Sequence, residues 1–291
     1  MPRLGAHLSI AGGLPRAIDR ARASKCEALQ IFTKSAGQWR ARALPADEIA
    51  LFREKAASAR MPIVAHNSYL INIAAADPTL RARSIAALGE ELDRAAALGL
   101  DALVMHPGAF TSGTEADGLR LIAEGIAVAL GERPAARVRL LLEHTAGQGT
   151  TLGHRFEHLA EIIERLEGTP RVGVCLDTCH LLSAGYDICT AEGYEETFTV
   201  FDRIVGISRI AAFHLNDSKK PCGSRVDRHE HIGRGCLGLE PFRRILNDVR
   251  FTGLPMMLET PKLETPESRR RSDADPWDMR NLRTLRKLVV T

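Results

Sequence analysis

Short apolar runs alternate along this chain with longer segments that have helical spacing. Eight runs rich in strand-forming residues lie at 4–9, 27–33, 61–69, 101–108, 139–145, 172–178, 210–217 and 255–260. Between them, segments such as 79–99 and 156–168 repeat Ala, Leu, Glu and Arg with helical periodicity, and Gly99 and Gly168 stand where helix C-caps are expected. Strands that alternate with helices predict an α/β protein with a parallel sheet.

The number of runs selects among parallel-sheet architectures. Eight strands favour a closed (β/α)8 TIM barrel over an open doubly wound sheet, which usually has fewer strands. No linker or shift in composition divides the chain, so we expect residues 1–291 to form a single barrel domain. In such a barrel the active site lies at the C-terminal mouth of the strands.

One run ends in an unusual way. After the apolar residues of 172–176, Asp177 and His180 follow at once. Asp is a favoured helix N-cap, so Asp177 could simply begin a helix. Asp oxygen and His nitrogen are also good zinc donors, so the pair could instead bind a metal. These residues alone leave both interpretations open.

Composition and charge restrict the class of protein. The chain of 291 residues is 45% hydrophobic and 26% charged, which is typical of a globular protein. No apolar run approaches the roughly 18 residues of a membrane span. The first residues lack a signal peptide, so we expect a cytoplasmic protein. The net charge of +3 is small but permits a local basic surface that holds phosphates. The six cysteines form no CxxC pair and are expected to be reduced thiols.

Acidic and imidazole side chains lie at or near the ends of most of the apolar runs. They are His7, His66, His106, Glu143, Asp177, His214 and Glu259. The C-terminal ends of all barrel strands face one mouth, so these groups should converge there. So many titratable groups in one pocket are costly unless they are paired or bound to cations. We therefore expect a metal centre, with His7 as a structural residue or a neighbour of the ligands.

The loop after the seventh run adds further donors, because Asp227 and His229 alternate there with Arg225 and Arg228. With His180, the candidate ligands become His66, His106, Glu143, Asp177, His180, His214, Asp227, His229 and Glu259. Nine donors are too many for one tetrahedral ion and about right for three, if carboxylates bridge. Imidazoles with carboxylates suit zinc, manganese or iron. Adjacent ions of this kind hydrolyse phosphodiesters.

Several longer motifs stand out along the chain. They include GAHLSIAGGL (5–14), LQIFTKS (29–35), SYLIN (68–72), CLDTCHLLSAGYD (175–187), FHLNDSK (213–219) and GSRVDRHEHIG (223–233). These motifs resemble the endonuclease IV family of apurinic/apyrimidinic endonucleases. The resemblance runs from Leu4 to the C-terminal helix. It implies a TIM-barrel enzyme of base excision repair that acts on double-stranded DNA, with no obligatory protein partner and as a monomer. It further implies cleavage on the 5′ side of an abasic site by a hydroxide activated by three zinc ions, leaving a 3′-hydroxyl and a 5′-deoxyribose phosphate.

The resemblance also implies a role for each matching residue. His66, His106 and Glu143 would hold one zinc ion, and Glu143 would bridge to a second ion held by Asp177, His214 and Glu259. His180, Asp227 and His229 would hold the third ion. Glu143 and Glu259 would act as catalytic carboxylates that position the hydroxide. Tyr69 and Leu70 retain the side chains that the family inserts into DNA. From its place after the second run, Gln38 could also contact DNA, and Lys219, Arg225 and Arg228 could contact phosphates because they flank the metal loop.

Three positions depart from the family's pattern. Asn67 stands where an Asp is expected, and His144 stands where an Asn is usual. Gly37 occupies a position where one family member places an Arg that enters the DNA beside the lesion. We expect the change at Gly37 to weaken binding of the lesion and to leave the hydrolytic chemistry intact. A sugar isomerase or epimerase with the same barrel, or a non-catalytic binder of damaged DNA, are the alternative functions.

Overall fold

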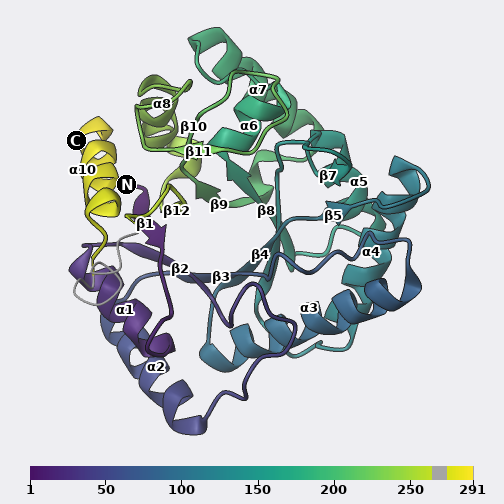
Figure 1. Cartoon of the computed structure of the whole chain (residues 1–291). Coiled ribbons are helices and arrows are strands. Elements are labelled where there is room, and N and C mark those ends of the chain that lie inside the picture. Colours follow the sequence, from purple (N-terminus) through teal and green to yellow (C-terminus); the bar gives the residue numbers. More distant parts are fainter. Residues whose placement is uncertain (264–273, 291) are drawn as a thin grey trace.

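The computed structural model describes residues 1–263 and 274–290, and within them eight parallel strands close into a barrel (Figure 1). The barrel strands are β1 (Arg3–His7), β2 (Ala28–Phe32), β3 (Ile63–His66), β4 (Ala102–Met105), β6 (Arg139–Glu143), β8 (Val172–Asp177), β9 (Ile210–His214) and β12 (Pro255–Leu258). Strand β1 pairs with both β2 and β12, so the first and last strands seal the ring. The predicted (β/α)8 barrel is confirmed.

Helices surround the ring of strands in Figure 1. They are α1 (Leu14–Ala23), α2 (Ala46–Ala59), α3 (Pro78–Leu98), α4 (Glu115–Gly131), α5 (Phe156–Arg165), α6 (Thr178–Ala184), α7 (Ala191–Ile204), α8 (Glu240–Asn247) and α10 (Pro276–Leu288). Two short antiparallel ribbons pair β5 (Gly108–Ala109) with β7 (Thr151–Leu152), and β10 (Asp217–Ser218) with β11 (His229–Glu230). Single 3-10 turns lie at Ile207–Arg209 and Val249–Phe251. In the described ranges, no helix is long and apolar enough to cross a membrane.

The boundaries of the elements differ slightly from the predicted ones. Every predicted strand is present, and each ends one to three residues earlier than expected, because its last polar residues already belong to a loop or helix. Gly99 caps α3 in the left-handed conformation, with φ of 73°, as predicted. The expected cap at Gly168 was wrong, since α5 ends at Arg165 and Leu166 is its C-cap.

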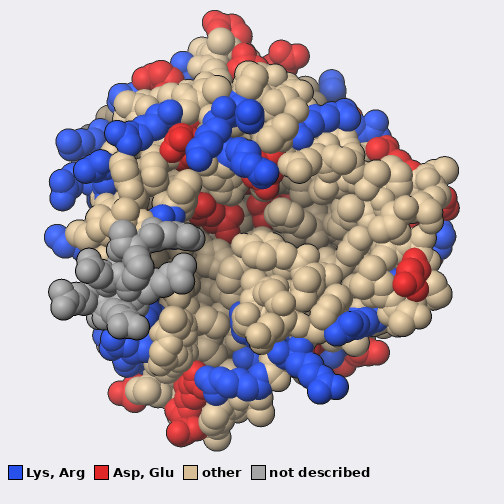
Figure 2. All heavy atoms as spheres, in the orientation of Figure 1, with Lys and Arg blue, Asp and Glu red and all other residues tan. Residues whose placement is uncertain are grey.

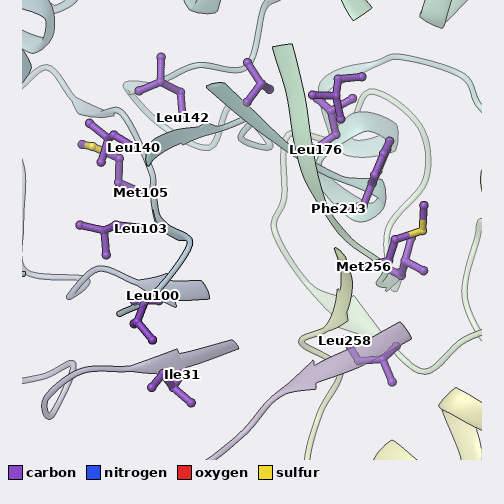
Figure 3. Close-up of a cluster of buried hydrophobic side chains, with 14 of the residues drawn as sticks. Ile31, Leu100, Leu103, Met105, Leu140, Leu142, Leu176, Phe213, Met256 and Leu258 are labelled. Atoms are coloured by element: carbon purple, nitrogen blue, oxygen red, sulfur yellow. The ribbon is translucent and has the colours of Figure 1, made fainter. Parts of the chain in front are cut away.

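Side chains of the barrel strands alternate between two apolar environments. The first set faces the helices, and Figure 3 shows members such as Leu103, Leu140 and Phe213 pointing away from the centre of the ring. Each such fully buried side chain contributes roughly 1.5–3 kcal/mol to stability. The second set fills the inside of the barrel and consists of Ala28, Val64, Ala102, Val104, Leu141, Cys175, Ala212 and Met257. The inner set is the floor on which the site rests.

A polar layer lies directly above that inner apolar floor. Residues two positions apart in a strand point to the same side, so each polar residue shares the inward direction of the floor residue before it. The layer contains His7, Gln30, His66, His106, Glu143, Asp177, His214 and Glu259, one from each strand or the residue just beyond it. The pleat of the strands therefore gathers these groups at the mouth.

We expect Gly5→Ala to destabilise the barrel strongly. A Cβ at Gly5 would lie 1.9 Å from the main-chain oxygen of Ala28 in the neighbouring strand, and a strand backbone cannot move aside as a side chain can. The free energy of unfolding should fall by about 3 kcal/mol or more, measured by urea unfolding.

Gly131→Ala is the matched control, because a Cβ there meets nothing within 4 Å at the end of α4. It should leave the stability unchanged or raise it by roughly 0.5–1 kcal/mol. Equal stabilities of the two variants would contradict the close approach of β1 and β2.

Candidate metal centre

The candidate site occupies a hollow at the centre of the barrel mouth. Figure 2 shows Asp and Glu atoms on the floor of this hollow, with Lys and Arg atoms gathered on the rim beside it. Four of the candidate residues are the last residues of their strands, namely His66, Glu143, Asp177 and His214. Two more directly follow a strand, namely His106 and Glu259. His180 lies in the first turn of α6, Asp227 in the loop before β11, and His229 in β11.

Glu143 lies at the centre of the site and is fully buried. One carboxylate oxygen, Oε2, is 3.0 Å from His66 Nε2 and 3.3 Å from His106 Nε2. The other oxygen, Oε1, is 3.1 Å from His214 Nδ1 and 3.3 Å from His180 Nδ1. Burial opposes ionisation of this carboxyl, but the surrounding histidines outweigh it and hold the pKa of Glu143 well below its usual range.

Asp177 has one carboxylate oxygen on each side of the two interpretations that its sequence position left open: one oxygen faces the start of a helix, and the other faces candidate ligands. Its Oδ1 accepts a hydrogen bond of 3.0 Å from the main-chain N–H of His180, which makes Asp177 the N-cap of α6. Its Oδ2 accepts a 2.6 Å hydrogen bond from Asn216 Nδ2 and lies 3.6 Å from His229 Nε2. The capping role is confirmed. The second oxygen accepts one hydrogen bond and has a further lone pair that could bind a cation.

A third carboxylate, Asp227, lies between two histidines. Its Oδ2 is 3.1 Å from His180 Nε2, and its Oδ1 is 3.2 Å from His229 Nε2. The loop that carries Asp227 contacts the loop after β6, because the Asp227 N–H donates to Gln148 Oε1. Burial opposes ionisation, but the two histidines outweigh it and hold the pKa of Asp227 well below its usual range.

The nine predicted ligands therefore form three adjoining groups. Within each group, the candidate ligand atoms all lie within 4.8 Å of one another. The groups are His66, His106 and Glu143; then Glu143, Asp177, His214 and Glu259; and then His180, Asp227 and His229. The structure brings all nine residues together at one mouth, with Glu143 shared between two of the groups.

The hydrogen bonds of the histidines decide where their lone pairs point. Three of them donate from Nδ1 to main-chain carbonyl oxygens: His66 to Asn67, His180 to His144, and His229 to Glu259. A carbonyl oxygen only accepts hydrogen bonds, so Nδ1 carries the proton in each of these rings. In the neutral ring, Nε2 must then hold the lone pair.

These Nε2 atoms face carboxylate oxygens at the distances given above, and the two attract each other only with a proton on Nε2 or a metal ion between them. The Nε2 atoms of His180 and His229 are buried and have no hydrogen-bond partner among the described residues. Metal-binding histidines commonly donate their other ring N–H in this way, which sets the orientation of the ring. Imidazole nitrogens and carboxylates around one point fit zinc.

The electrostatics of the rings agree with a place for positive charge. Burial opposes protonation of His66, but its hydrogen bond to Glu143 and the charge of that carboxylate outweigh burial and raise the pKa of His66. Burial likewise opposes protonation of His229, but Asp177 and Asp227 raise its pKa to about 9. The carboxylates that attract a proton to these rings would attract a metal ion in the same way.

Two of the three departures from the family pattern lie beside ligands, yet their contacts run through the main chain. Asn67 is buried and accepts from His66 through its carbonyl oxygen. His144 is also buried, and its carbonyl oxygen accepts a 2.8 Å hydrogen bond from His180. Burial lowers the pKa of the His144 imidazole to about 3, so this ring is neutral. A changed side chain at either position leaves these ring orientations intact.

Two buried amides were not among the predicted site residues. Gln30 Oε1 accepts a 2.8 Å hydrogen bond from His214 Nε2, and Asn216 holds Asp177 as described above. Gln30 could have been found from the alternation of its strand, because it lies two residues after the inward-facing Ala28. His7, expected to neighbour the ligands, lies with Nδ1 2.9 Å from Glu259 Oε1.

The residues expected to contact DNA are all exposed or half-buried. Tyr69 is 71% exposed, beside the half-buried Leu70. The other candidates, Gln38, Lys219, Arg225 and Arg228, are exposed as well. A Cβ at the exposed Gly37 would meet nothing within 4 Å, so there is room for a larger side chain. Nearby, the Arg83 guanidinium stacks 4.1 Å from the centre of the Trp39 ring.

A further group of potential ligands lies at the starts of α4 and α5, at Glu115, His154 and His158. The Arg155 guanidinium lies against it, with 2.8 Å to Glu115 Oε1 and 2.9 Å to His158 Nε2. Because this fixed cation already neutralises the group, we regard it as a structural contact between α4 and α5.

Fold and site together define the class of the protein as a TIM barrel with a candidate metal centre at its mouth. A family described as xylose isomerase-like TIM barrel matches residues 18–285. A protein of a Geobacter species named "Probable endonuclease 4" is 49% identical over 290 residues, which are 99% of each chain. The crystal structure of endonuclease IV from Thermus thermophilus is 38% identical with a TM-score of 0.85, and covers 99% of this chain and 98% of that one.

The chain belongs to the endonuclease IV family, as its motifs had indicated. It is therefore a nuclease, a hydrolase of DNA repair, and its substrate is DNA. The structure of an L-ribulose 3-epimerase has a TM-score of 0.70 but only 17% identity over 99% of this chain and 93% of that chain, which shows a shared barrel fold alone.

Proposed function

We propose that this nuclease is an apurinic/apyrimidinic endonuclease. It hydrolyses the phosphodiester on the 5′ side of an abasic site in double-stranded DNA and leaves a 3′-hydroxyl and a 5′-deoxyribose phosphate. The observation that carries the proposal is the set of imidazole lone pairs aimed at buried carboxylates in an open hollow. Such a hollow attracts positive charge, and clustered metal ions bind and polarise a phosphodiester.

The donor set supports about three zinc ions, since each of the three groups offers the imidazoles and carboxylates of a zinc site. His66, His106 and Glu143 would hold the first ion, and Glu143, Asp177, His214 and Glu259 the second. His180, Asp227 and His229 would hold the third. Bound zinc would supply the Lewis acidity that activates water and neutralises charge on the phosphate.

Glu143 and Glu259 are the proposed catalytic carboxylates, which hold the attacking water in line with the phosphorus. Glu143 is held in place by four ring nitrogens, as described above. Glu259 is anchored through Oε1 by His7 and Gln30, which leaves Oε2 directed at His214 Nδ1 at 3.3 Å. Oxygens fixed in this way lose little entropy when the substrate binds.

The exposed and half-buried residues named above are proposed to hold the DNA. Tyr69 and Leu70 would insert into the stacked bases beside the lesion, at a cost of a few kcal/mol for unstacking. Lys219, Arg225 and Arg228 would contact phosphates, and Gln38 would contact the backbone beside the lesion. Such contacts place the abasic site over the hollow without reading the base sequence.

We further propose that residues 1–291 form one domain that works as a monomer in the cytoplasm, without an obligatory protein partner. Pairing of β1 with β12 joins both ends of the chain in one barrel, which supports a single domain. Exposed large apolar side chains such as Leu51, Val128 and Val249 belong to different elements, which supports a monomer. A role in DNA repair supports location in the compartment that holds the DNA.

The decisive experiment combines substrate and metal. Zinc-loaded protein should cut a duplex with one abasic site once, on the 5′ side of the lesion, and should leave the matched intact duplex uncut. Removal of metal by a chelator should abolish cleavage, and added zinc should restore it. Elemental analysis should find about three zinc ions per chain. Cleavage that survives chelation, or conversion of a ketose sugar without DNA cleavage, would reject the proposal.

His180→Ala should release one ion and leave the others in place. The third group would keep two protein ligands, whereas the groups around Glu143 lose none of theirs. One ion at the phosphate contributes several kcal/mol, and each 1.4 kcal/mol is about tenfold in rate. Single-turnover cleavage should therefore fall at least about a hundredfold, whereas binding of the abasic duplex should fall far less.

The matched control for His180→Ala is His158→Ala, which removes another buried imidazole that is not one of the nine candidate ligands. This control should keep its full zinc content and near-normal cleavage. If His180→Ala instead kept its full zinc content and near-normal cleavage, His180 would not be a zinc ligand and would only be part of the first turn of α6.

Gly37→Arg should tighten binding to the abasic duplex by about tenfold, which is ~1.4 kcal/mol. The exposed position accepts the side chain without a clash, and a guanidinium there would gain contacts with DNA. Single-turnover cleavage of bound DNA should change little. Gly37→Gln supplies similar length without charge and should gain less. A large change in the cleavage step at unaltered affinity would show that this loop contacts the reacting phosphate.

A further inference from the structure

Gln30 lies inside the barrel beneath the site and is fully buried. Its amide nitrogen is 2.5 Å from Glu259 Oε1 and 3.0 Å from His7 Nδ1. Its amide oxygen is 2.8 Å from His214 Nε2. One side chain of β2 thus contacts two of the candidate ligands, which come from β9 and from the end of β12.

The chemistry of these contacts allows one orientation of the amide. As a metal ligand in the proposed centre, Glu259 would bind through an ionised carboxylate. An ionised carboxylate only accepts hydrogen bonds, so the NH2 group of Gln30 must face Glu259. The amide oxygen then faces His214, which must donate its Nε2 proton to it.

The proton on Nε2 determines the ligand atom of His214. Nδ1 holds the lone pair of the neutral ring, and it is directed at Glu143 Oε1 and Glu259 Oε2, at 3.1 and 3.3 Å. Three other candidate histidines have their protonated nitrogen set by main-chain carbonyls, which a substitution does not remove. At His214 the same role belongs to a side chain, so it can be tested by substitution.

We propose that Gln30 is a positioning residue of the metal centre, which selects Nδ1 of His214 as the ligand atom and holds the Glu259 carboxylate beside it. The inference rests on the proposed metal centre and names a residue that tunes it. Partners of this kind typically change metal affinity by about 10–100-fold. The alternative is that Gln30 only fills the barrel, in which case it affects stability and not the metal.

Two variants separate the contacts of Gln30. Gln30→Met keeps the approximate length and removes both hydrogen bonds. Gln30→Glu keeps the shape and the acceptor for His214 Nε2–H, but it cannot donate to Glu259. Ser24→Ala is the control, because the buried Ser24 hydroxyl has no hydrogen-bond partner within residues 1–263 and 274–290 and lies at the C-cap of α1, outside the mouth. Folding of each variant is checked by thermal unfolding.

The first readout is zinc affinity, measured by competition with a chromophoric chelator. Gln30→Met should weaken one class of zinc by about 10–100-fold and leave the remaining zinc bound as in the parent chain. Ser24→Ala should bind zinc as the parent does. If Gln30→Met also binds zinc within about twofold of the parent, the positioning role is wrong. If Gln30→Met fails to fold, the inference is tested with Gln30→Glu and the NMR measurement described next.

The second readout is the nitrogen NMR spectrum of the histidine rings in zinc-loaded protein. In the parent chain, His214 should show a proton on Nε2, shifted downfield by its hydrogen bond. Gln30→Glu should move this proton further downfield, because a hydrogen bond to a charged acceptor is stronger. Gln30→Met should move it upfield. A His214 ring with its proton on Nδ1 in the parent chain would overturn the inference.

The outcomes keep the two proposals distinct. If the chain binds zinc with the expected Gln30 dependence but does not cut abasic DNA, the proposed function fails and the role of Gln30 stands. If the chain cuts abasic DNA but Gln30→Met leaves zinc binding and the His214 proton unchanged, the role of Gln30 fails alone.

Discussion

The mouth of this barrel depends on one buried carboxylate, Glu143, that faces four imidazoles. A carboxylate with no exposed surface is costly unless opposite charge or hydrogen-bond donors surround it. In neutral His66 and His180 the one N–H group donates to a main-chain carbonyl. The other nitrogen of each ring then faces a carboxylate and needs a proton or a metal ion between the two. The metal ions of the proposed function would take the place of these protons, which links the geometry of the site to hydrolysis of a charged backbone.

The rest of the fold holds that arrangement rigid. An apolar floor inside the barrel and an apolar layer under the helices fix the strands from both sides (Figure 3). Closed parallel pairing places every strand end at one mouth. Segments outside the barrel strands complete the site, because α6 supplies His180 and the β10–β11 ribbon supplies His229. The zinc proposal therefore needs no movement of the backbone.

The sequence predicted the strands from local periodicity, the barrel from their number, and the ligands at strand ends from both. Alternation in β6 places Leu141 and Glu143 on one side, and the same rule holds for Cys175 and Asp177 in β8. The expected end of α5 at Gly168 was wrong, because a glycine marks a possible helix end and local hydrogen bonds choose the real one. Gln30 was missed because an uncharged amide gives no sign of metal chemistry by itself.

What the sequence by itself determined is therefore the kind of groups at the mouth and the side of each strand on which they lie. A strand of β-forming residues imposes a period of two whatever its neighbours are. Only the tertiary structure decided which atom of each group faces inward. The choice between Nδ1 and Nε2 depends on a partner from another strand, and for His214 that partner is Gln30, which lies 184 residues away along the chain. Periodicity cannot encode such a contact, because the partner is brought to His214 only when the barrel closes.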